Sequence, residues 1–119
     1  MRVEIVDDYT LEVTGLDESG VPAEPRVNAV QLLGLALAQC TYTVLATYGE
    51  RLNVSASGIR IALKMTPQEA PKRISAISMD VRWPDLPESR LDAATRAARH
   101  CTVHATLSPG VEVDVLVDN

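Results

Sequence analysis

The sequence contains no phenylalanine and few aromatic side chains of any kind. Trp83 and three tyrosines are the only large aromatics among 119 residues, so leucine, valine, isoleucine and alanine must fill the interior. The hydrophobic share of 46% is enough for one core in a chain of this length. We therefore predict a single domain over residues 1–119.

A cluster of basic residues and an apolar amino-terminal run are also missing. The formal charge is -5, and 11 basic residues are scattered among 16 acids, which argues against nucleic acid as a partner. The opening MRVEIVDD has acids from position 4 onward, unlike a secretory signal peptide, so we expect a cytoplasmic protein. In that compartment two cysteines are typically redox-active, metal-bound or buried.

The longest uncharged stretch, Val27 to Tyr48, carries Cys40 a little past its middle. It is just long enough to cross a bilayer, but polar side chains interrupt it and basic anchors are missing, so we expect no membrane partner and a helix buried by protein. Asn28 is the expected N-cap, and Gly49 is the expected end. A helix that is apolar nearly all round must be covered all round, which favours burial in a homodimer.

The rest of the chain alternates strand patterns with one further helix. Residues 15–28 read as a long irregular loop, and Ser57-Gly58 marks a change of parity that predicts a bulge. A second helix is expected from about Pro87, with Cys101 on its core-facing stripe. The expected strands are residues 2–6, 9–13, 53–65, 73–83 and 111–117.

Two segments of the sequence resemble the OsmC/Ohr family. VQLLGLALAQCTYTVLATYGERL is similar to the central helix of that family, and LPESRLDAATRAARHCTVHATLSPGVEVDV is similar to its second-cysteine region. The resemblance covers about Arg2 to Val117. It implies an α+β fold in which antiparallel sheets surround a long central helix bearing a cysteine, in an intertwined homodimer.

The resemblance also implies thiol peroxidase chemistry in defence against oxidative stress, with no cofactor and no metal. Cys40 would attack an organic hydroperoxide as the thiolate and become a sulfenic acid, and Cys101 would condense with it into a disulfide. An external dithiol would then reduce the pair. The expected partners are thus a second copy of the chain, a small hydroperoxide and a dithiol.

One feature of active family members has no match in this sequence. They place a glutamate at the start of the central helix, where it orients an arginine from the amino-terminal region, and Val30 stands at that place. Arg2 and Arg26 are the arginines available by region. The alternative hypothesis is therefore an OsmC-like small-molecule binding or interaction module that has lost its activating pair.

Several residues near the proposed site have more than one interpretation. Cys40 could be a packed small hydrophobe. Gln31 could orient a ligand or the thiol, or be a buried glutamine satisfied by a partner subunit. His104 is predicted to be a hydrogen-bonded turn residue near the site. His100 and His104 could also join both cysteines in a zinc site, although adjacent His100 and Cys101 project in different directions on a helix.

Overall fold

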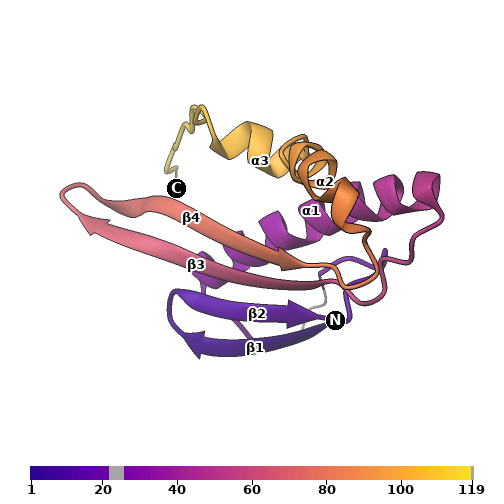
Figure 1. Ribbon diagram of the computed structural model, residues 1–119. Coiled ribbons are helices and arrows are strands. Elements are labelled where there is room, and N and C mark those ends of the chain that lie inside the picture. Colours follow the sequence, from indigo (N-terminus) through magenta and orange to yellow (C-terminus); the bar gives the residue numbers. More distant parts are fainter. Residues whose placement is uncertain (22–25, 119) are drawn as a thin grey trace.

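The computed structural model describes residues 1–21 and 26–118. It contains one four-stranded antiparallel sheet of order β1-β2-β3-β4, with the helix α1 running across one of its faces (Figure 1). The helices α2 and α3 pack against α1. The elements are β1 Arg2–Asp7, β2 Thr10–Thr14, α1 Ala29–Leu52, β3 Arg60–Glu69, β4 Lys72–Arg82, the 3₁₀ turn η1 Glu88–Arg90, α2 Leu91–Ala98 and α3 Thr102–Leu107.

The sheet buries one face under α1 and leaves the other to solvent. Alternation along β2 and β3 puts five apolar side chains on the buried face, where each is almost fully buried. This cluster is the core on which α1 rests, and it contains no aromatic ring. Its members are Leu11, Val13, Ile61, Leu63 and Met65.

The strands expected at residues 2–6 and 9–13 pair as one hairpin and those expected at 53–65 and 73–83 as another, and the second differs in detail from the expectation. The β3–β4 hairpin is longer than expected, because β3 continues through Pro67 to Glu69 and the turn is only Ala70-Pro71. The predicted bulge at Ser57-Gly58 is wrong, since residues 53–58 form a connection that precedes β3. The register shifts instead between Thr66 and Pro67, where proline supplies no N–H to the ladder.

The predicted start of α1 is confirmed, whereas its predicted end is wrong. Asn28 Oδ1 accepts from Gln31 N at 2.8 Å and Gln31 Oε1 accepts from Asn28 N at 2.8 Å, which is a reciprocal capping box. The helix runs on to Leu52 and is capped by Asn53, whose φ of 55° is left-handed. Gly49 lies inside the helix at a close approach to the chain that follows.

The single second helix predicted from Pro87 is in fact interrupted. It begins as a 3₁₀ turn, continues as α2, and breaks before Cys101, which is the N-cap of α3. The Cys101 sulfur accepts a hydrogen bond from His104 N at 3.2 Å, and this local bond competes with continuation of α2. Cys101 is buried, as its predicted place on the core-facing stripe requires, whereas Leu91 at the start of α2 is half exposed.

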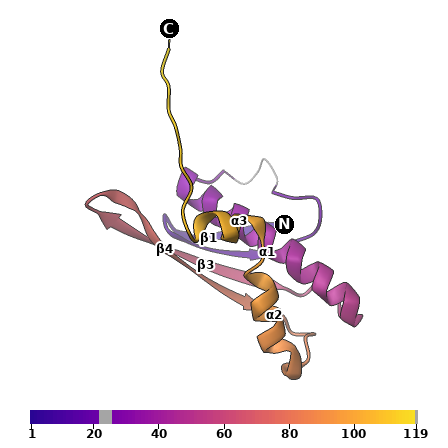
Figure 2. The ribbon, with the colours of Figure 1, turned by 90° about the horizontal axis from the view of Figure 1, so that it is seen from above.

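The strand predicted at residues 111–117 is not formed in the single chain. This segment lies outside every strand, and its apolar side chains are 63 to 90% exposed. Figure 2 shows it extending away from the body of the molecule. The residue pattern is that of a strand, and the described part of the same chain offers it no neighbouring strand.

The long loop at residues 15–28 is irregular in its described parts, as predicted, and residues 22–25 lie outside the described residues. By length and composition, α1 is the one helix in the described ranges that could cross a membrane. Its packing on the sheet fits the core helix of a soluble protein.

Candidate functional site

The fold brings the two cysteines together from positions far apart in the chain. Cys40 lies in the middle of α1, and Cys101 lies at the break between α2 and α3. Both are free thiols, and Cys101 lies close enough to Cys40 to raise the pKa of Cys40. Cys101 is only 1% exposed, whereas Cys40 is half-buried. Of the two sulfurs, Cys40 is therefore the one that a molecule from solution can reach.

The Cys101 sulfur accepts two hydrogen bonds from two different helices. One comes from His104 N in α3 at 3.2 Å, and the other comes from Thr41 Oγ1 in α1 at 3.8 Å. Thr41 is completely buried. Sequence reasoning missed its role, although a polar residue beside Cys40 in an apolar helix was a visible signal.

Opposing influences act on the Cys40 thiol. Burial is the largest of them and raises the pKa of Cys40 above its ordinary value of 9.0, and the nearby Cys101 thiol raises it further. The backbone N–H groups of Val103 and Thr102 act in the opposite direction, since they donate toward the sulfur. The net effect is a raised pKa, so Cys40 is mainly protonated at neutral pH in the single chain.

Alkylation of Cys40 by a neutral reagent should therefore keep accelerating above pH 9. Only the thiolate reacts with the reagent. Because the pKa of Cys40 is raised above the ordinary thiol value of 9.0, the thiolate forms mainly above pH 9. The measurement is the rate of iodoacetamide labelling against pH, with peptide mapping to assign the label to Cys40. A labelling midpoint at or below neutral pH would contradict this expectation.

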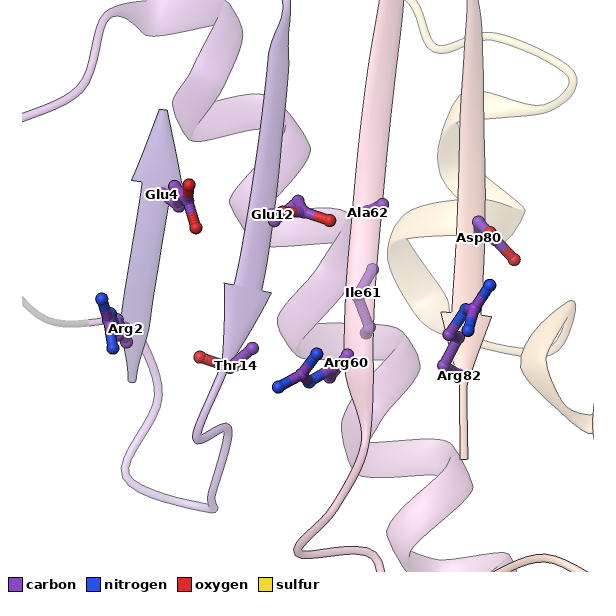
Figure 3. A pocket seen from close by; sticks show the side chains of 9 residues that line it. All are labelled: Arg2, Glu4, Glu12, Thr14, Arg60, Ile61, Ala62, Asp80 and Arg82. Atoms are coloured by element: carbon purple, nitrogen blue, oxygen red, sulfur yellow. The ribbon is translucent and has the colours of Figure 1, made fainter. Parts of the chain in front are cut away.

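The two arginines selected by region do not lie beside Cys40. Arg2 projects from β1 on the solvent face of the sheet, and α1 lies behind the opposite face (Figure 3). Arg26 is exposed in the segment before α1. Across the described ranges, no guanidinium contributes to the electrostatics of Cys40. Within the described part of the single chain, neither Arg2 nor Arg26 is therefore an activating cation for Cys40.

Arg2 instead belongs to a charged hollow of about 440 Å³ on the solvent face. Its floor is the small side chain of Ala62, and strand pairing sets Arg60 beside Arg82 and Glu4 beside Glu12 (Figure 3). The lining of the hollow contains no cysteine, and the hollow lies across the sheet from Cys40 and Cys101. The other lining residues are Thr14, Ile61 and Asp80.

Gln31 lies at the amino-terminal end of α1, and Cys40 lies nine residues later, about 13 Å along the axis. Its Nε2 donates to Asp7 O at 3.1 Å, and its Oε1 belongs to the capping box with Asn28. The side chain thus ties the end of β1 to the start of α1. Val30, in place of the family glutamate, is partly buried against the core. A binding role for Gln31 stays a prediction.

His104 is half-buried and lines two hollows, neither of which has Cys40 or Cys101 in its lining. One hollow, of about 420 Å³, lies between α1, β4 and α2, and the other, of about 380 Å³, lies between α1, β4 and α3. Leu37 and Ile77 are shared by both walls. The zinc alternative finds no support, because the described residues contain no group of three or more metal-ligating side chains.

A long helix packed on one face of an antiparallel sheet, with two short helices packed against it, defines an α+β protein. The model of the OsmC-like protein family matches residues 21–116, so the chain belongs to the OsmC-like family. The chain is also similar to a solved structure from Psychrobacter arcticus 273-4, described as a candidate osmotic stress induced and detoxification response protein. That match has a TM-score of 0.62 and 16% identity, covers 87% of this chain and 84% of the other, and shows a common fold. No curated protein sequence matches.

Proposed function

We propose that this protein is a thiol peroxidase that reduces organic hydroperoxides with Cys40 and Cys101. The observation that carries the proposal is that the fold brings two free thiols, 61 residues apart in the sequence, close enough for Cys101 to affect the pKa of Cys40. In the cytoplasm, where permanent disulfides are rare, such a pair is suited to a disulfide that forms and is reduced again.

Cys40 is the more exposed of the two cysteines, so it reacts first with the hydroperoxide, and the buried Cys101 reacts second. The Cys40 thiolate attacks the distal oxygen of the hydroperoxide, the O–O bond breaks, and the alkoxide leaves and takes a proton to become an alcohol. Cys40 is then a sulfenic acid. The Cys101 thiolate attacks the Cys40 sulfur, the S–S bond forms, and the departing hydroxide becomes water. An external dithiol reduces the disulfide and is itself oxidised.

Two further features support this assignment. The N–H groups of Val103 and Thr102 donate toward Cys40 and favour its charged form. His104, three residues after Cys101, lines two hollows whose walls contain the apolar side chains of Leu37 and Ile77, which suit the hydrocarbon part of an organic hydroperoxide.

The test is a count of free thiols after reduced protein is mixed with cumene hydroperoxide. Two thiols per chain should be lost, and a dithiol should restore both. Hydrogen peroxide in a parallel series tests the preference for an organic substrate. If no thiol is lost at hydroperoxide concentrations on the order of millimolar, the peroxidase proposal fails.

A second function, a small-molecule binding or interaction module, is favoured by the raised pKa of Cys40 and by Val30 in the place of the family glutamate. A protonated thiol reacts slowly with peroxides because the thiolate is the nucleophile. The discriminating measurement is the pKa of Cys40 in the protein as it assembles in solution. A strongly depressed value would refute the binding module, and a value at or above 9.0 would support it.

We also propose that the chain functions as a homodimer in which residues 111–117 add to the sheet of the second copy. The valines at 111, 113, 115 and 117 alternate as in a strand and are exposed in the single chain. Leu32 on α1 is likewise 50% exposed. Pairing with a second copy would cover these apolar side chains and satisfy the backbone of residues 111–117.

Deletion of residues 111–119 should therefore weaken or abolish the dimer. Burial of one valine contributes about 1.5 kcal/mol or more, so the loss of several should raise the dimer dissociation constant by far more than tenfold. Light scattering after size-exclusion chromatography gives the mass directly. Glu112→Gln, which leaves the valines intact, is the control and should remain dimeric. A truncated chain that stays dimeric at equal concentration would show that these residues do not form the interface.

A further inference from the structure

Thr41 differs from other threonines in the helices in the acceptor of its hydroxyl hydrogen bond. Its hydroxyl donates to the Cys101 sulfur at 3.8 Å, and the side chain is 0% exposed. The others donate to the carbonyl oxygen four residues earlier in their own helix, at 2.8 to 3.0 Å. These are Thr43, Thr47, Thr95 and Thr106.

We propose that Thr41 is a positioning residue that stabilises Cys101 as a thiolate, which makes Cys101 the leaving group when the disulfide is reduced and Cys40 the sulfur that the reductant attacks. The role assigned to Thr41 rests on the redox function proposed above. It adds which of the two sulfurs the reductant attacks when the disulfide is reduced, and it assigns this selectivity to Thr41.

Hydrogen-bond donors directed at the Cys101 sulfur favour its thiolate form. A thiolate accepts hydrogen bonds more strongly than a thiol, so donors directed at a sulfur favour its charged form. Thr41 Oγ1 and His104 N both donate to the Cys101 sulfur. A charged sulfur that is only 1% exposed cannot be solvated by bulk water, so these donors take the place of water.

Two properties determine which sulfur the reductant attacks: the stability of the departing thiolate and the accessibility of each sulfur to the incoming thiolate. Thiol–disulfide exchange occurs at the sulfur that the incoming thiolate can reach, and it is faster when the departing sulfur is a stable thiolate. Cys40 is half-buried and Cys101 is almost fully buried. The incoming thiolate therefore bonds to Cys40 while the S–S bond breaks, and Cys101 leaves with the electron pair. The second thiol of the dithiol then displaces Cys40, so the dithiol ends as a disulfide.

The first experiment measures the Cys101 thiolate without any peroxide. In a Cys40→Ser background the ultraviolet absorbance of the remaining thiolate is followed against pH, with His104 present in every variant. Thr41→Val, which keeps the shape but removes the hydroxyl, should move the midpoint upward by about one pH unit, since one hydrogen bond to a charged group amounts to about 1.5 kcal/mol. Thr41→Ser should restore the original midpoint.

The controls separate a local effect from a general one. Thr43→Val, which removes an exposed hydroxyl bonded to Gln39 O at 3.0 Å, should leave the midpoint unchanged. Thermal unfolding identifies any variant that fails to fold, and Thr41→Ala serves as the second variant. An unchanged midpoint in folded Thr41→Val or Thr41→Ala would overturn the role of Thr41. Failure of the hydroperoxide reaction alone would count against the peroxidase function and would leave this result in place.

The second experiment finds the sulfur that the reductant attacks. The disulfide is formed with diamide, treated briefly with glutathione, and quenched with N-ethylmaleimide before peptide mapping. Glutathione should be found on Cys40 and N-ethylmaleimide on Cys101. Thr41→Val should slow this step about threefold to fivefold at neutral pH, because the rate changes by only a fraction of the expected one-unit shift in the pKa of the leaving sulfur. The reverse labelling pattern would overturn the proposed direction.

Discussion

Replacement of Gly49 by alanine should lower the free energy of unfolding by about 3 kcal/mol or more. A Cβ at this position would lie 2.7 Å from Val54 O and 2.9 Å from Trp83 Cζ2. The oxygen belongs to the backbone, and the Trp83 ring is held by a hydrogen bond from Nε1 to Ser55 O at 2.7 Å. Neither neighbour can move without disturbing the connection between α1 and β3. Chemical denaturation at a fixed protein concentration measures the loss.

Gly58→Ala is the matched control for this prediction. A Cβ at Gly58 would meet only Pro84 Cδ, at 3.8 Å, which is ordinary van der Waals contact. Alanine is also the better helix former, so propensity alone would favour Gly49→Ala in α1. Equal or higher stability of Gly49→Ala would therefore show that the close approach of α1 to Trp83 is not tight in solution.

The elements set by local pattern could be predicted from the sequence. The alternation of apolar and polar side chains in β1 to β4 indicates a sheet with one buried face. The uncharged sequence of α1 indicates a helix that is buried on several sides. The cap at Asn28 was predictable because the capping box lies within four residues of sequence. These features need no knowledge of the rest of the chain.

The features that were missed depend on contacts between distant segments. Gly49 was taken as a helix end because glycine often ends helices, whereas Trp83 and Val54 explain its presence inside α1. Cys101 was placed inside a helix because helical periodicity does not report a side-chain cap. Residues 111–117 have the pattern of a strand, but pairing requires a neighbour that the sequence does not identify.

The site was only partly predictable, for the same reason. Two cysteines in separate helical segments suggested a pair, but the bond from Thr41 to Cys101 depends on the packing of α1 against α3. Arg2 was considered as an activating arginine by region, although strand alternation argues against that position. Val3 points toward the core, so its neighbour Arg2 points to solvent, away from α1.

The largest effect on activity is expected from substitution of Cys40. Cys40→Ser removes the accessible sulfur, so the reaction with an organic hydroperoxide should fall to background and the remaining thiol should persist. Cys101→Ser keeps the first step and removes the second, so one thiol per chain should be lost and a sulfenic acid should accumulate at Cys40, where dimedone traps it. Stopped-flow mixing and mass spectrometry give the two rates and the site of the adduct.

The contrast between the two variants tests the order of events as well as the identity of the nucleophile. If Cys101→Ser reacts as slowly as Cys40→Ser, both sulfurs are needed for the first step, and the interaction of Cys101 with Cys40 then has a part in activating it. If Cys40→Ser keeps the original rate, the buried Cys101 is the sulfur that meets the peroxide. Because Cys101 is 1% exposed, that outcome would require the segment between α2 and α3 to open before each turnover.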